Sequence, residues 1–357
     1  MPQRFDVCNG DADGLCAALQ WRFHEPVPAT LQTGLKHDIA MLERVHANAG
    51  DEVNVFDLSM QRNRAALLGL LGAGVRVRYF DHHAVCDIPS HPLLEAHIDC
   101  ASDVCTSLLV DRRIGGAFRA WALVGAYGDN LAGVADRLAA DGGIGTVDST
   151  RLRRLGEAIN YNAYGDDERD VWIAPARLYA VMARYRDPRD MLAHEAIADE
   201  IDTRRRADLR QALAWPPHRQ DAHGSVLVLP DAAWSRRVLG CLANELANAQ
   251  PQRAHAVLKL QRTGAYAVSV RAPLASPSGA DALCSRFGGG GRARAAGIDG
   301  LPAADLERFL AAFASTRWGG QAPMRSGDGD ADGDTDGDTD GDDDGDDDGG
   351  SGQHSRR

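Results

Sequence analysis

A carboxylate and two imidazoles stand in succession at Asp81, His82 and His83. Residues 75–80 before them alternate in the manner of a β-strand, which predicts that the triplet lies at the carboxyl end of that strand. Ligands of open α/β sheets collect at this end. A group of this kind is hard to bury without an ion to satisfy it. A His-His pair on a loop is also often solvated, so the triplet indicates a metal site only together with other residues.

Three further segments place aspartates at or near the end of an apolar run. Asp11 and Asp13 lie between a predicted strand at residues 4–8 and a predicted helix at 15–23. Asp57 follows residues 53–56, and Asp129 follows the run 121–126. Each aspartate taken singly could be only the N-cap of a helix. All four segments in this order favour divalent cations held by mixed Asp and His ligands.

The order Asp-x-Asp-Gly, Asp, Asp-His-His and Gly-Asp resembles the DHH phosphoesterases, among them RecJ-type exonucleases, nanoRNase/pAp phosphatases, cyclic-di-AMP phosphodiesterases and family II pyrophosphatases. Residues 286–297 resemble the glycine-rich substrate motif of a DHHA1 domain, and residues 269–271 resemble its arginine-bearing strand. The resemblance covers nearly all of residues 1–318. It implies a hydrolase that cuts phosphate esters with metal-activated water.

The resemblance also implies the site residues. Two divalent cations are expected, with Mn²⁺ favoured over Mg²⁺ or Co²⁺, and Asp57 would bridge them. Asp81 would orient an imidazole, and His83 would face the scissile phosphate as a donor or general acid. The implied metal ligands are Asp11, Asp13, Asp57, His82 and Asp129. The implied substrate-binding residues are Arg271, Gly289, Gly290, Gly291, Arg292 and Arg294.

Two residues depart from the family pattern. Asn9 stands near the position where the family has a His or Asp ligand, and an amide is a weaker, neutral ligand. Arg292 stands where the glycine-rich motif normally has a His. Arginine can clamp a phosphate, but it cannot act as a general acid near neutral pH. Arg292 therefore puts the substrate class in question more than the reaction type.

The expected fold is α/β with four parts. They are an N-terminal parallel-sheet DHH domain at 1–187, a helical connector at 188–222, a smaller α/β DHHA1 domain at 223–318 and a disordered Asp/Gly-rich tail at 319–357. A helix is expected at 105–113, capped by Ser102 or Asp103, and residues 191–213 could form one long connecting helix. The site is expected in a cleft between the two domains.

The charge is concentrated in the tail. Residues 328–357 contain 13 Asp and two Arg, so this segment contributes −11 to a net charge of −12. The remaining 327 residues carry −1. Such a nearly neutral body favours a short charged substrate over a long nucleic-acid track. The tail lacks the final Glu of a calcium loop, which favours a solvating polyanion, and no partner for it is indicated.

The seven cysteines have no CxxC pairing, and no apolar span of membrane length is found, so a reduced cytoplasm is the expected setting, with no membrane partner. The favoured substrate is a short oligonucleotide or small nucleotide. A processive RecJ-type 5′–3′ single-strand exonuclease and a catalytically weakened nucleotide-binding regulator remain alternatives. A homodimer is left open.

Overall fold

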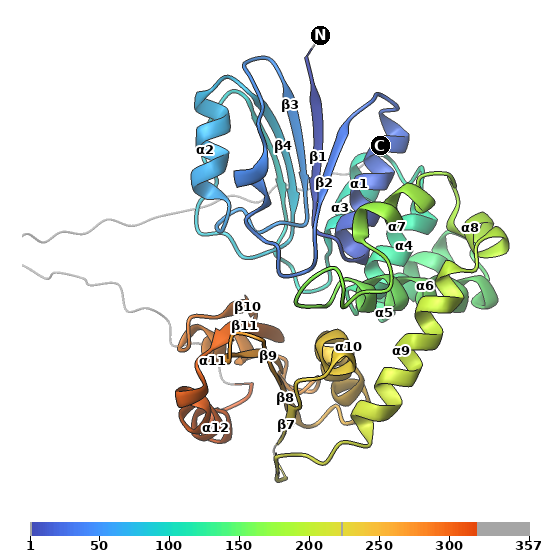
Figure 1. The fold of residues 1–357 in the computed structure, drawn as a ribbon. Helices are drawn as coiled ribbons and strands as arrows, with labels where there is room; N and C mark the ends of the chain where they lie inside the picture. Colours follow the sequence, from blue (N-terminus) through green and yellow to red (C-terminus); the bar gives the residue numbers. More distant parts are fainter. Residues whose placement is uncertain (1, 223, 320–357) are drawn as a thin grey trace, which may run out of the picture. The chain divides into compact units, whose positions relative to one another are not determined.

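A computed structural model describes residues 2–222 and 224–319 (Figure 1). The predicted tail therefore lies outside the described residues, except for Gly319. The first sheet has the strand order β2-β1-β3-β4-β5 with every neighbouring pair parallel, which confirms the predicted parallel sheet. Its strands are β1 (Arg4–Cys8), β2 (Thr30–Thr33), β3 (Glu52–Phe56), β4 (Arg76–Asp81) and β5 (Leu94–Ile98).

Helices cover both faces of this sheet because its strands are apolar on both sides. Val53 and Val55 of β3 belong to the same core cluster as Leu67 of α2 (Arg64–Gly72). Phe56 and Phe80 belong to a second cluster, which contains residues of many helices, among them three that pack against one another. These helices are α1 (Ala12–His24), α3 (Thr106–Arg113) and α4 (Arg119–Gly128). In Figure 1, α2 lies on one side of the sheet and α1 and α3 on the other.

The second sheet is mixed, with the order β10-β11-β9-β8-β7-β6. Only β7 and β8 are parallel neighbours, and β8 and β9 are antiparallel around the predicted turn at Thr263 and Gly264. Its strands are β6 (Arg219–Gln220), β7 (Gly224–Leu229), β8 (Ala254–Leu260), β9 (Tyr266–Arg271), β10 (Gly290–Arg292) and β11 (Ala295–Leu301). Its helices are α10 (Ala233–Ala249), α11 (Ala280–Ser285), η2 (Ala303–Asp305) and α12 (Leu306–Ser315).

Helices fill the chain between the sheets, but the single long helix expected at 191–213 is wrong. Two helices occupy this stretch, α8 (Pro188–His194) and α9 (Ile197–Leu213), with Glu195 and Ala196 between them. Pro188 begins α8, where its missing N–H costs nothing. The remaining elements are η1 (Met41–Arg44), α5 (Ala132–Asp141), α6 (Thr146–Asn162) and α7 (Pro175–Met182).

Buried contacts join α6 and α9 to the second sheet. Tyr161 of α6 and Ile201 of α9 share a core cluster with Leu227 of β7 and Leu239 of α10. Arg237 of α10 also hydrogen-bonds the Tyr161 hydroxyl at 2.8 Å. The domain borders predicted at 187/188 and 222/223 stay predictions. Among the described residues, no helix has both the length and the apolar character that a membrane crossing requires.

Candidate metal and substrate site

The carboxyl ends of three neighbouring strands place the predicted residues together. Asn9 to Asp13 follow β1, Asp57 follows β3, and Asp81 ends β4 before His82 and His83. Because β1, β3 and β4 are adjacent and parallel, these residues lie at one edge of the sheet. Asp57 has a φ of 57°, in the left-handed region that few side chains other than Asn and Asp adopt.

Asp13 caps a helix that lies far from it in sequence. Its Oδ2 accepts the N–H of Thr106 and its Oδ1 accepts the N–H of Ser107, each at 2.8 Å. These are the first two residues of α3, so a carboxylate of α1 satisfies the unpaired amides of another helix. The prediction that Ser102 or Asp103 caps this helix is wrong, since Cys105 is the N-cap residue and no side chain of its own caps α3.

His82 and Asp57 face each other with lone pairs. The Nδ1 of His82 lies 3.0 Å from the Val104 carbonyl oxygen, which can only accept, so Nδ1 carries the ring proton. The unprotonated Nε2 lies 3.2 Å from Asp57 Oδ1 and 3.9 Å from Asp13 Oδ2. Burial, followed by the charges of Asp11 and Asp13, raises the pKa of Asp57 well above its usual value. The pair therefore requires a shared cation, a proton or a metal ion.

Asp81 orients His83. Asp81 Oδ1 accepts the backbone N–H groups of His82 and His83 and lies 2.6 Å from His83 Nδ1, while Oδ2 accepts the Met60 N–H. Burial alone would lower the pKa of His83, but the charge and hydrogen bond of Asp81 raise it. Asp57, His82 and His83 offer atoms within 4.8 Å of one another, which could hold a metal ion. Because His83 Nδ1 donates to Asp81, Nε2 is the ring atom left to bind a cation or, when the ring is protonated, to donate a proton.

Asp11 is paired with a lysine that sequence reasoning missed. Asp11 caps α1 by accepting the Gly14 N–H at 3.0 Å, and its Oδ2 forms an ion pair with the Lys36 ammonium. Burial alone would raise the pKa of Asp11, but the Lys36 charge and these hydrogen bonds hold it below its usual value. The sequence offered one signal, since the 39 Lys and Arg residues include only two lysines, Lys36 and Lys259.

Asp129 ends α4 as its C-cap and pairs with the second sheet. Arg292 Nη2 lies 2.9 Å from Asp129 Oδ2, and Arg292 Nη1 lies 3.4 Å from His82 Nδ1. Burial alone would raise the pKa of Asp129, but the charge and hydrogen bond of Arg292, together with the charge of Lys36, lower it. The structure thus brings Arg292, 163 residues later in the chain, against two of the expected metal ligands.

The other predicted substrate residues surround Arg292 in the second sheet. Gly290 and Gly291 belong to β10, which pairs antiparallel with β11 and is therefore an ordered hairpin. Arg271 donates to Asn244 at 2.7 Å and to Ser269 at 2.9 Å. The guanidinium of Arg294 has no hydrogen bond or ion pair within the described part of the chain. Burial, with the charge of Arg292, lowers the pKa of both Arg271 and Arg294, so this cluster is suited to an anion.

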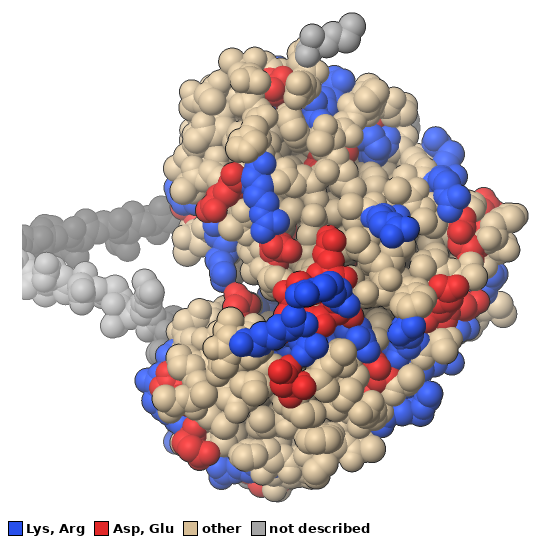
Figure 2. Space-filling view, viewed as in Figure 1, with Lys and Arg blue, Asp and Glu red and all other residues tan. Residues whose placement is uncertain are grey.

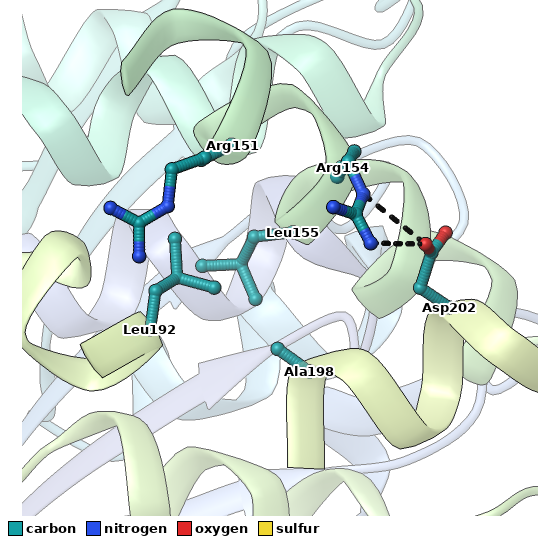
Figure 3. Close-up of a pocket in the computed structure, with 6 residues that line it drawn as sticks. All are labelled: Arg151, Arg154, Leu155, Leu192, Ala198 and Asp202. Atoms are coloured by element: carbon teal, nitrogen blue, oxygen red, sulfur yellow. Dashed lines mark hydrogen bonds and ion pairs between the residues drawn. The ribbon is translucent and has the colours of Figure 1, made fainter. Parts of the chain in front are cut away.

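A pocket elsewhere contains none of these residues. It lies among α6, α8 and α9, and Figure 3 shows Arg154, but not Arg151, linked to Asp202. Leu155, Leu192 and Ala198 give it an apolar floor. The face in Figure 2 carries Lys or Arg and Asp or Glu side chains interspersed, with no single-sign stripe. Among the described residues, neither the pocket nor this surface brings together a group of possible catalytic side chains like the one at the strand ends.

Comparisons with known proteins bear on the fold. No protein-family model matches the sequence, and no curated protein matches it. Among solved structures, an exonuclease RecJ bound to manganese has a TM-score of 0.55 and 20% identity, over 87% of this chain and 89% of that one. The DHH domain of a member of the s1p family of ribosomal proteins has a TM-score of 0.58 and 12% identity, over 88% and 86%.

A third solved structure is the pGpG-specific phosphodiesterase PggH from Vibrio cholerae, with a TM-score of 0.50 and 14% identity. The match covers 87% of this chain and 97% of that one. At such identities the likeness concerns the arrangement of the backbone. Together with the parallel sheet and the mixed second sheet, it shows that this chain has the fold of the DHH superfamily.

Proposed function

We propose that this protein is a divalent-metal-dependent phosphoesterase that hydrolyses phosphodiester or phosphomonoester bonds of short oligonucleotides or small nucleotides. The observation that carries the proposal is the approach of His82 Nε2 to Asp57 Oδ1 at 3.2 Å, where two buried acceptors face each other. A divalent cation between them would satisfy both and relieve the repulsion among Asp11, Asp13 and Asp57. Asp57 and His82, with Asp13 nearby, are therefore a donor set suited to a divalent cation.

Residues of the chain would bind the cation, donate a proton and bind the phosphate. Asp57 and His82 would hold the cation, with Asp13 Oδ2 near enough to join them. When bound, the cation lowers the pKa of a coordinated water and supplies hydroxide near neutral pH. His83, held by Asp81, would donate a proton to the leaving oxygen. Arg292 would hold phosphate oxygens, and Arg271, Arg294 and Gly289 to Gly291 would receive the rest of the substrate.

Two similar structures and the surface charge support the proposed substrate class. The manganese-bound RecJ is an exonuclease and PggH is a pGpG-specific phosphodiesterase, so both act on phosphodiester bonds. The mixed charges on the face in Figure 2 favour a short substrate over a long strand. A processive single-strand exonuclease remains the second candidate, since the RecJ structure matches over most of its length.

The experiment is hydrolysis of a 5′-labelled panel that runs from dinucleotides to long single strands, with pAp and cyclic dinucleotides added. Mn²⁺ is the cofactor, and Asp57→Asn is the control, because Asn tolerates the positive φ at this position. Cleavage that falls with substrate length supports the proposal, and processive cleavage of long strands supports the exonuclease. No cleavage of any member by the metal-loaded protein contradicts both.

A further inference from the structure

Asp11 is fully engaged by groups of the chain. Its side chain is 3% exposed, its Oδ1 accepts the Gly14 N–H, and its Oδ2 is paired with the Lys36 ammonium. Its backbone N–H donates to Asn9 Oδ1 at 3.2 Å. An ion placed against Oδ2 would meet the ammonium at contact distance, and two cations so close repel each other strongly in a buried site. The residues on this side of the site therefore do not fit the second divalent cation that the resemblance implies.

Asn9 holds the lysine in place. Its Nδ2 lies 3.4 Å from the Lys36 carbonyl oxygen, while its Oδ1 accepts the Asp11 N–H. The Lys36 N–H donates to the Ala163 carbonyl at 3.0 Å, which fixes the same segment from the other side. Asn9, which replaces an expected metal ligand, thus connects Asp11 to the backbone of Lys36. Asn9 and Lys36, the two unusual residues of this site, therefore act together to hold the ammonium against Asp11.

The type of residue at position 36 supports the same interpretation. Among 39 Lys and Arg residues only Lys36 and Lys259 are lysines. An ammonium is a compact point charge, closer in form to a metal ion than the planar guanidinium that this chain uses elsewhere. Lys259 of β8 is 5% exposed and pairs with Asp166, which lies between α6 and α7, so it offers a matched control away from the strand-end site.

We propose that Lys36 is a built-in cation that replaces one of two metal ions, so that the centre takes a single divalent cation at Asp57 and His82. The inference rests on the proposed function for that one cation. The site's carboxylates outnumber its fixed cations Lys36 and Arg292, and one divalent ion reduces this excess without reversing it. Lys36 then keeps a positive charge beside Asp11 at all times. The carboxylates counted here are Asp11, Asp13, Asp57, Asp81 and Asp129.

The test is the number of Mn²⁺ ions in the site of the metal-free, full-length protein. Equilibrium dialysis gives the bound Mn²⁺, and Asp57→Asn serves as the blank for ions held by other acidic residues. Electron paramagnetic resonance separates an isolated Mn²⁺ from a spin-coupled pair. The wild type, Lys36→Arg and Lys259→Met are each expected to hold one uncoupled ion above the blank. Lys36→Met is expected to gain a second, coupled ion.

The outcomes separate the inference from the proposed function. A coupled Mn²⁺ pair in the wild type overturns the role of Lys36 and leaves the phosphoesterase proposal standing. One ion in both the wild type and a folded Lys36→Met also overturns it, because Lys36 then does not exclude the second ion. The double variant Asn9→His with Lys36→Met places a histidine where the family has a metal ligand. A single bound ion in this double variant also overturns the inference about Lys36. No Mn²⁺ above the blank overturns the proposed function together with the inference.

Discussion

Arg292 Nη2 donates a 2.9 Å hydrogen bond to Asp129 Oδ2, and this contact connects β10 of the second sheet to the end of α4. Both side chains are largely buried, with 18% and 15% of their surfaces exposed. A substrate phosphate at the strand-end site would compete with Asp129 for this guanidinium. Binding of a phosphate would therefore weaken a contact between β10 and the end of α4.

Arg292→Lys is expected to lower kcat/KM at least about tenfold, mainly through KM, because a hydrogen bond to a charged group contributes about 1.5–3 kcal/mol. The lysine keeps the charge but loses the fork that spans two oxygens. Steady-state kinetics on the best dinucleotide substrate measures the effect. Arg286→Lys, at the exposed end of α11, is the control and should leave both constants unchanged. Equal losses in the two variants would count against phosphate binding by Arg292.

Asp57→Asn is expected to raise the Tm of the metal-free protein, since it removes a buried carboxylate whose pKa is raised by burial and by Asp11 and Asp13. The same change should abolish stabilisation by Mn²⁺, which at a hundred times its Kd contributes about 2.7 kcal/mol to the wild type. Thermal unfolding with and without Mn²⁺ checks both expectations. A variant that is still stabilised by Mn²⁺ as strongly as the wild type would remove Asp57 from the ligand set.

Two neighbouring glycines should behave differently. A Cβ at Gly289 would lie 2.2 Å from the Gly297 carbonyl oxygen and 2.7 Å from Ile298, so Gly289→Ala is expected to cost about 1–3 kcal/mol of stability. A Cβ at Gly290 meets nothing within 4 Å. Gly290→Ala is thus expected to keep its stability and to raise KM, if substrate lies against this backbone. Urea unfolding and kinetics on both variants make the distinction, and an unchanged KM in Gly290→Ala would place substrate elsewhere.

His255 should make the protein sensitive to acid. It is buried in β8, its Nδ1 lies 2.8 Å from Ser225 Oγ, and burial lowers its pKa below 6.5. Because the folded state disfavours the protonated ring, the stability due to neutral His255 is present above about pH 6.5 and is lost as the pH falls toward the lowered value. His255→Gln is expected to lose less Tm than the wild type between about pH 7.5 and about pH 5. His46→Gln, at an exposed position, should follow the wild type.

The strand ends of the site could be predicted because each strand carries a local signal. Residues 4–8 and 53–56 are short strand-like runs followed by Asn9-Gly10 and by Asp57, and the observed β1 and β3 agree with them. The adjacency of β1, β3 and β4 then brings Asp11, Asp57 and Asp81 to one edge. Position relative to a parallel sheet was enough to predict that these residues lie together.

Two of the wrong or missed features concern partners far apart in sequence, and a third is local. The cap of α3 was expected from the adjacent Ser102 or Asp103, whereas Asp13 provides it from α1. Lys36 was missed because it follows β2 in a segment without periodicity, and only its contact with Asp11 reveals it. The break between α8 and α9 was missed because Glu195 and Ala196 are not helix-breaking residues.

Asp13 has a consequence for how related sequences are interpreted. Both of its carboxylate oxygens accept amides of α3, so an acid at this position stabilises the fold whether or not the protein is catalytically active. An intact Asp-x-Asp-Gly motif is therefore weak evidence of activity in a diverged homologue. Asp57 and His82 are more informative, since no backbone amide depends on the Asp57 carboxylate or on the His82 Nε2 in the described residues.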